Sequence, residues 1–275
     1  MFWTRLLSGI ILVALIIAGV AFGDLPLVIF SCVVGLVGLY EFYRLEGLQR
    51  APGAFVCYAA TVVYYLNIIY LDDEYTMQIL ATLTLLTAAL YVLQYPKRRP
   101  SEFTHLVFGF IYVVLMFSFL LRVRHADAGS AMVWLIFIAA WGCDTMAYLA
   151  GLLFGRHKLT PQLSPKKTVE GAVGGVVGAV GLSYLYIFLL EKFSFGGLRV
   201  FTMRTYVMAM TIVFCASVFS QFGDLFASSL KRAKGVKDFG RLIPGHGGIL
   251  DRFDSILFTA PAVYIILTLF LGFGR

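Results

Sequence analysis

The sequence carries little charge for its length. Only 13% of its 275 residues are Asp, Glu, Lys or Arg, whereas soluble domains carry about 25%. Hydrophobic residues make up 60%. This composition excludes a soluble globular domain and indicates an integral membrane protein. The basic residues lie in short loops between apolar runs, which argues against a nucleic-acid partner. The few cysteines are far apart in apolar segments, which excludes a disulfide framework and a CxxC metal motif: Cys32, Cys57, Cys143 and Cys215.

Apolar runs predict an all-α polytopic bundle, because only helices satisfy the backbone across a membrane at these lengths. A window of about 19 residues gives nine spans, at roughly 6–22, 25–40, 54–71, 76–95, 104–121, 131–154, 170–190, 205–228 and 255–273. The first run is expected to stay as an anchor, since only Arg5 precedes it and a second span follows at once.

The distribution of basic residues predicts the orientation. Most of the 22 Lys and Arg residues fall in loops on the side of the N-terminus, so this side is expected to be cytoplasmic. Residues 1–125 are expected to form a transmembrane scaffold of about five spans. Residues 126–275 are expected to form the catalytic region of about four spans with charged cytoplasmic loops. The expected location is the cytoplasmic (inner) membrane of a bacterium.

Four aspartates stand in or beside the last spans: Asp144, Asp224, Asp251 and Asp254. Carboxylates are costly inside a membrane and usually face a cavity or a partner. Clustered carboxylates repel one another unless cations neutralise them, so convergence at one depth predicts a metal centre. The alternatives are a structural ion pair for Asp144, and stabilisation of a helix N-terminus for Asp251 and Asp254.

Charge is densest between Gln221 and Asp254, where six Lys or Arg residues, four Asp and a glycine-rich turn predict a site for a polyanion. A second basic pair, Lys166 and Lys167, follows Ser164 and Pro165. This segment predicts a helix start with the lysines at its N-terminus, where they bind an anion or lipid phosphates.

Three other features favour structural interpretations. The glycines after Lys167, from Gly171 to Gly181, predict close helix packing or a dimer contact. Glu41 is expected to pair locally with Arg44, three residues on. His246 either donates to a phosphate or caps its loop.

From Ser228 the chain reads S-S-L-K-R, four residues, K-D-F-G, and then I-P-G-H-G-G-I-L-D-R-F-D. This pattern resembles the signature of phosphatidate cytidylyltransferases (CDP-diacylglycerol synthases). The segments D-T-x-A-Y, F-G-R-H-K-L and S-P-K-K-T-x-E-G resemble the same family. Met146 departs from it, since a small residue is expected after the Asp-Thr pair, and a narrower cavity near Asp144 would follow.

The resemblance implies that CTP and phosphatidic acid give CDP-diacylglycerol and pyrophosphate, with Mg2+ as the cofactor. Whether a second cation such as K+ also binds is left open. It also implies a homodimer. Asp224 and Asp251 are the expected principal metal ligands, with Asp144 and Asp254 in support. The catalytic residues are expected to be Asp224, Asp251, Lys237 and Arg252. The substrate-binding residues are expected to be Ser164, Lys166, Lys167, Ser228, Ser229, Lys231, Arg232, His246, Gly247 and Gly248.

Two other functions combine some of these features. A CTP-dependent polyprenol or dolichol kinase also joins cytidine triphosphate to a membrane lipid, but its lipid hydroxyl would need a general base. An ion-coupled transporter also carries intramembrane aspartates and glycine-rich breaks, but polarity confined to one half of the chain disfavours it.

Overall fold

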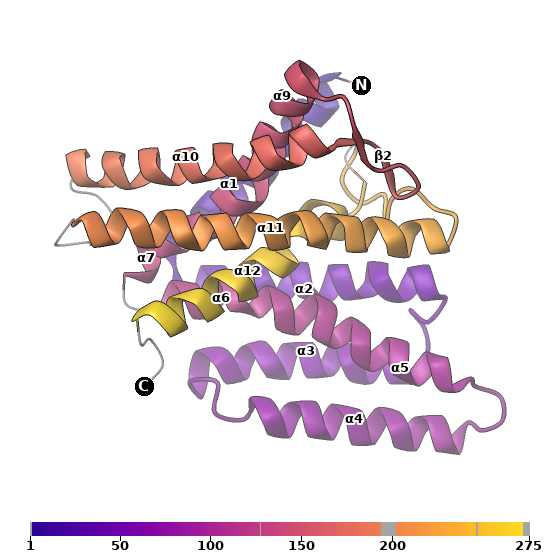
Figure 1. Cartoon of the computed structure of the whole chain (residues 1–275). Coiled ribbons are helices and arrows are strands. Elements are labelled where there is room, and N and C mark those ends of the chain that lie inside the picture. The colour runs from indigo at the N-terminus through magenta and orange to yellow at the C-terminus, as the bar shows by residue number, and fades with distance from the viewer. Residues whose placement is uncertain (1, 127, 194–201, 246, 272–275) are drawn as a thin grey trace. The chain divides into compact units, whose positions relative to one another are not determined.

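The computed structural model describes residues 2–126, 128–193, 202–245 and 247–271, and at 2–7, 24, 270 and 271 it describes the backbone alone. Helices form nearly all of the described chain (Figure 1). Eight described helices are long and apolar enough to cross a membrane, and the described part of the first, Ser8–Phe22, is apolar but shorter. The fold is therefore an all-α polytopic membrane protein, as the composition predicts.

Each predicted span corresponds to one helical segment. The first four are α1 (Phe2–Phe22), α2 (Asp24–Glu46), α3 (Pro52–Tyr70) and α4 (Thr76–Leu93). The fifth is a continuous run of α5 (Pro100–Gly109), the π-helix η1 (Phe110–Leu115) and α6 (Met116–His125). The sixth joins α7 (Gly129–Met132), α8 (Trp134–Phe137), the π-helix η2 (Ile138–Gly142) and α9 (Cys143–Phe154). The last three are α10 (Val169–Phe193), α11 (Met203–Ala233) and α12 (Leu250–Leu271).

The chain divides into two compact units. The first contains residues 1–118 and 238–252, so the glycine-rich part of the charged stretch groups with the N-terminal helices. Its core is aromatic, and the hydroxyls of Tyr43 and Tyr64 find partners there. Tyr43 donates to the Leu106 carbonyl at 2.6 Å, and Tyr64 meets the Ser118 hydroxyl at 2.8 Å. These bonds let large aromatic side chains be buried without an unpaired hydroxyl.

The second unit contains residues 119–237 and 253–275. In it α10 packs between α9 and α11 (Figure 1). Glycines make the first of these contacts possible, because a Cβ at Gly174 would meet the Cβ of Ala150, and one at Gly175 would meet Ala147. The predicted packing role of this glycine series is therefore confirmed, except at Gly181, where a Cβ would meet nothing within 4 Å.

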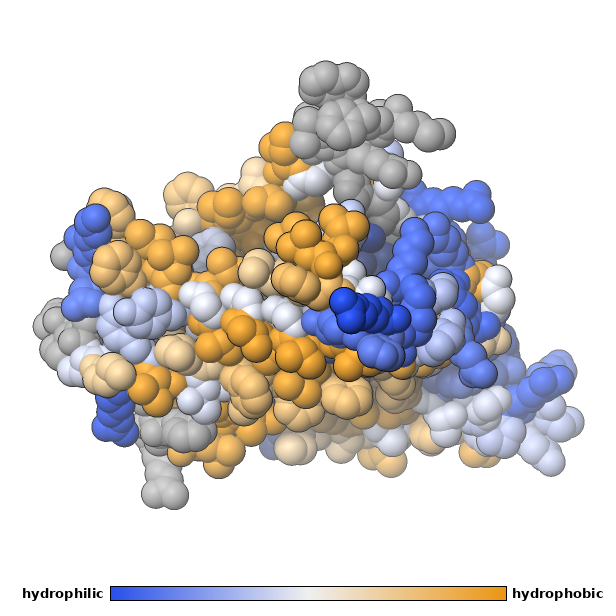
Figure 2. Space-filling model, turned by 45° about the horizontal axis from the view of Figure 1, so that its top comes forward, coloured by the Kyte–Doolittle hydropathy of each residue, from blue (hydrophilic) through white to orange (hydrophobic). Residues whose placement is uncertain are grey.

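Apolar side chains also cover much of the outside. Figure 2 shows hydrophobic residues spread across the middle of the face in view, with hydrophilic residues toward its ends. Leu152 is 70% exposed and Val177 66% exposed. Exposed apolar area of this extent indicates contact with lipid rather than water.

Candidate active site

The basic pair Lys166 and Lys167 lies on a β-hairpin rather than at a helix start. Strand β1 (Lys158–Thr160) pairs antiparallel with β2 (Ser164–Thr168), and α10 begins only at Val169. The predicted helix start at Ser164 is therefore wrong. Proline disfavours helical backbone in the residue before it, so Pro165 holds Ser164 extended.

Glu170, in the first turn of α10, fastens the segment that leads into β1. Its carboxylate accepts the backbone N–H of Arg156 at 3.0 Å and that of His157 at 3.2 Å, and it meets His157 Nδ1 at 2.6 Å. These bonds fix the chain just before β1. Because Lys158 pairs with Thr168, these bonds and the direct link from β2 into Val169 hold the same end of the hairpin against α10.

A cavity of about 400 Å³ opens in the second unit between α9, the hairpin, α10 and α11. One part of its wall is apolar and includes Tyr148, Leu152 and Leu159. Another part carries charged and amide side chains: Asp144, Lys166, Lys167, Gln221 and Asp224. A wall that joins apolar surface to opposite charges is suited to an amphipathic anion.

Lys167 and Asp224 form an ion pair across this cavity, from β2 to α11. Gln221, one turn before Asp224, donates to the Ala172 carbonyl of α10 at 2.8 Å and contacts Cys143 Sγ of α9 at 3.5 Å. Gln221 thereby fixes the rotation of α11 so that Asp224 faces the cavity. Its i, i+3 spacing from Asp224 is visible in the sequence, but its two partners are not.

Met146, where the sequence departs from the family pattern, packs against Gly178 of α10. Its side chain would contact a Cβ placed at Gly178, and it is not among the residues that line the cavity. The narrowing expected near Asp144 therefore does not come from Met146.

Asp254 and Lys231 form a second ion pair in the same unit. Lys231 Nζ lies 4.0 Å from Asp254 Oδ2, and both residues are 8% exposed. Asp224 and Asp144 both act electrostatically on Asp254. Asp144 also accepts a hydrogen bond from the Ser255 hydroxyl at 3.4 Å. Three of the four predicted aspartates thus belong to one electrostatic group within the second unit.

No three His, Cys, Asp or Glu side chains in the described part of the chain are gathered closely enough to hold a metal ion by themselves. Lysines instead face Asp224 and Asp254. Mg2+ is commonly held by only one or two carboxylates together with substrate phosphate oxygens and water. The donor set of Asp224 and Asp254 fits a cation bound in that manner, and the metal roles of all four aspartates stay predictions.

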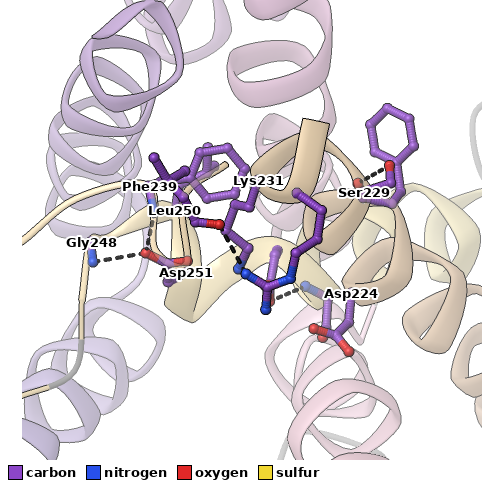
Figure 3. Close-up of polar contacts among 12 residues, drawn as sticks. Asp224, Ser229, Lys231, Phe239, Gly248, Leu250 and Asp251 are labelled. Atoms are coloured by element: carbon purple, nitrogen blue, oxygen red, sulfur yellow. Dashed lines mark hydrogen bonds and ion pairs between the residues drawn. The ribbon is translucent and has the colours of Figure 1, made fainter. Parts of the chain in front are cut away.

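Asp251 belongs to the first unit and organises the glycine-rich loop. Its Oδ2 accepts the backbone N–H of Phe239 at 2.8 Å and of Gly248 at 2.9 Å (Figure 3). The N–H of Ile243 donates to the Gly247 carbonyl at 2.9 Å, and Gly247 has φ +87°, which favours glycine. The Gly248 N–H is used inside the loop, so substrate contacts of Gly247 and Gly248 stay predictions.

The other predicted substrate-binding and catalytic residues vary in their surroundings. Ser229 donates to the Phe226 carbonyl at 2.7 Å and Arg232 to the Val236 carbonyl at 2.9 Å, so both bond locally. Ser228 is half-buried on α11 and Lys237 is exposed. The buried Nε of Arg252 has no hydrogen-bond partner in the described part of the protein. His246 lies outside the described residues.

Glu41 was not expected at the site, and the structure brings its carboxylate to the start of α12. It is 3% exposed and accepts the N–H groups of Ile249 and Leu250. Arg44 does interact electrostatically with Glu41, as expected, but the carboxylate also makes two hydrogen bonds to a distant part of the chain, which was not expected. No local signal could have revealed this contact, because the partners lie 208 and 209 residues further along the chain.

Comparisons with known proteins identify the family. The model of the Cytidylyltransferase family matches residues 3–270. The phosphatidate cytidylyltransferase of Bacillus subtilis (strain 168) is 33% identical over 97% of this chain and 97% of its own length. That of Thermotoga maritima is 35% identical over 89% of this chain and 88% of its own. The phosphatidate cytidylyltransferase of Staphylococcus aureus (strain COL) is 31% identical over 96% of this chain and 98% of its own length. This chain therefore belongs to the cytidylyltransferase family and is a nucleotidyltransferase.

Proposed function

We propose that this protein transfers the cytidylyl group of CTP to phosphatidic acid, which yields CDP-diacylglycerol and pyrophosphate. The observation that carries the proposal is the cavity of the second unit, where an apolar wall adjoins Lys166, Lys167 and Asp224. Such a wall suits a lipid with a phosphate head. The relatives named phosphatidate cytidylyltransferase support the same substrate.

In this reaction an oxygen of the lipid phosphate attacks the α-phosphorus of CTP. A new P–O bond forms there, and the bond from the α-phosphorus to the oxygen that bridges it to the β-phosphate breaks. The electron pair leaves with pyrophosphate. No side-chain nucleophile and no general base is required, because the attacking phosphate is already ionised near neutral pH. The difficulty is instead the approach of two anions.

The basic side chains meet that difficulty by lowering repulsion between the two substrates. Lys166 and Lys167 would hold phosphate oxygens at the cavity, with Lys167 leaving Asp224 in part as the substrate enters. Lys231, Lys237 and Arg252 would hold the remaining phosphates. Arg252 suits this role, because its buried Nε lacks a hydrogen-bond partner among the described residues and a guanidinium binds phosphate well.

Mg2+ would be held by the carboxylate oxygens of Asp224 and Asp254. The sequence-based prediction adds Asp144 and Asp251 as ligands. Mg2+ bound in this way neutralises phosphate charge and helps pyrophosphate to leave. A second cation such as K+ belongs to the same proposal. The carboxylates also set the position of Lys167 and Lys231 before the substrates arrive, because each lysine faces one of them.

We further propose that the protein lies in a bacterial cytoplasmic membrane, with its N-terminus and charged loops in the cytoplasm, where CTP is found. The excess of Lys and Arg on that side supports this orientation. A homodimer is part of the same proposal. Chemical cross-linking in native membranes tests the homodimer: a cross-linked dimer is expected, and an exclusively monomeric species would contradict it.

The test is transfer of label by protein purified in detergent. With phosphatidic acid and Mg2+, label from α-labelled CTP should enter the lipid fraction, and label from γ-labelled CTP should not. Lipid labelled from the γ-position would indicate a lipid kinase instead. Lys167→Met should lower the rate strongly. Lys158→Met is the matched control, because Lys158 is exposed on the same hairpin and does not line the cavity.

A further inference from the structure

Glu41 connects the second membrane helix to the part of the chain richest in predicted site residues. It lies near the end of α2, and its side chain is almost fully buried at 3% exposure. Its Oε1 accepts the Ile249 N–H at 3.1 Å, and its Oε2 accepts the Leu250 N–H at 2.9 Å. Both carboxylate oxygens are therefore used by successive backbone groups at the start of α12.

The glycine-rich loop closes around this carboxylate. A Cβ added at Gly240 or at Gly248 would run into the Glu41 carboxylate. The backbone can therefore approach Glu41 from two sides only because both positions lack a side chain. This close approach gives Gly248 a reason to be glycine that is independent of contact with a substrate.

Asp251 completes the arrangement, since it accepts the N–H groups of Phe239 and Gly248 (Figure 3). The N–H groups of Gly248, Ile249 and Leu250 follow one another in the chain, and all three donate to a carboxylate. Such groups at a helix N-terminus lack partners within the helix and favour negative charge. Glu41 and Asp251 together fix the loop and the first turn of α12.

We propose that Glu41 is a positioning residue for cytidylyl transfer. It holds Gly240 and residues 248–250 so that Asp251 and Arg252, the next residues of α12, keep their orientation. Glu41 does not contact the substrates, because both of its oxygens are occupied by the backbone. The role needs a carboxylate, since the two N–H groups meet different oxygens and a glutamine would place an NH2 donor against one of them. This inference rests on the proposed function.

The test compares Glu41→Gln with Glu46→Gln. Glu46 lies on the same helix and pairs with His105 at 3.1 Å, so it is a matched control. Hydrogen exchange is measured in peptides that contain Ile249 and Leu250, and turnover is measured by cytidylyl transfer. In Glu41→Gln we expect exchange there to rise about tenfold, because one of the two N–H groups loses its acceptor. We expect the turnover number to fall by about 10- to 100-fold, because misplaced site groups are costly.

A general loss of structure would change the exchange of α4 and the KM for phosphatidic acid, so both are measured as well. In Glu41→Gln we expect the exchange of α4 and the KM for phosphatidic acid to stay at the parental level. In Glu46→Gln we expect all four measurements to match the parent. Faster exchange with parental turnover would overturn the proposal, and so would reduced turnover with unchanged exchange.

If Glu41→Gln does not accumulate, Gly240→Ala replaces it. This variant places a methyl group against the Glu41 carboxylate and leaves the carboxylate in place. It should produce the same change in exchange and in turnover, and parental values for both would overturn the proposal. If the parent itself transfers no cytidylyl group, the proposed function fails, while the exchange of Glu41→Gln still tests the geometry separately.

Discussion

Removal of Lys231 should destabilise the second unit unless Asp254 is neutralised as well. The two residues form an ion pair with a separation of 4.0 Å between Nζ and Oδ2, and each is 8% exposed. In Lys231→Met a side chain of similar length replaces the lysine, and only the ammonium group is lost. Asp254 is then left buried beside Asp224 and Asp144, which carry charge of the same sign.

The distance sets the size of the effect. Two unit charges 4.0 Å apart attract by about 4 kcal/mol at an effective dielectric constant of about 20. Removal of one partner from a buried pair typically costs about 3–5 kcal/mol, whereas neutral groups in place of both partners are often tolerated. Lys231→Met should therefore lose about 4 kcal/mol, and the double variant Lys231→Met/Asp254→Asn should regain most of it.

Thermal unfolding in detergent measures this difference. For a chain of this size about 1 kcal/mol corresponds to roughly 2–4 °C, so the single variant should melt about 10 °C below the parent. The double variant should melt within a few degrees of the parent. The single variant Asp254→Asn is measured as well. If the double variant loses as much stability as Lys231→Met and Asp254→Asn lose together, the reasoning is refuted, because Lys231 and Asp254 then do not interact.

Three further predictions concern other parts of the site. Asp251→Asn should stay folded, because its amide oxygen still accepts a loop N–H, but its transfer rate should fall by about 100-fold; a parental rate would remove Asp251 from the site. Glu170→Gln weakens the bonds that hold the hairpin, so the KM for phosphatidic acid should rise about fivefold, and an unchanged KM for this lipid would contradict a hairpin role in binding. Gly174→Leu should lower the folded yield in membranes because it meets Ala150 of α9, whereas Gly181→Leu, with open space around its Cβ, should not; equal yields would contradict the packing.

The helices were predictable because hydropathy is a local property. Each apolar run became a helical segment. The ends agree within a few residues in α10, where 170–190 is expected and Val169–Phe193 is found, and differ most in α2, which ends at Glu46 rather than at residue 40. The glycine packing of α10 was predictable for the same reason. The hairpin was not, because hydropathy does not separate a polar loop from a short polar strand, and the extended backbone forced by Pro165 outweighed the helix-start pattern of Ser164.

Long-range contacts explain the remaining differences at the candidate site. The aspartates could be picked out because charge is rare in membrane segments. Their lysine partners could not, since the Lys167–Asp224 pair joins residues 57 positions apart. The sequence suggested a local ion pair for Glu41, because Arg44 is close in the chain. Its hydrogen-bond partners, Ile249 and Leu250 at the start of α12, come from the far end of the sequence.

The most direct test of the central claim is the stoichiometry of the reaction in the parent and in Asp224→Asn. With α-labelled CTP and phosphatidic acid, the parent should release one pyrophosphate for each lipid that becomes labelled, and Asp224→Asn should do so at a strongly reduced rate. CDP released in place of pyrophosphate, or a parental rate in Asp224→Asn, would contradict the account.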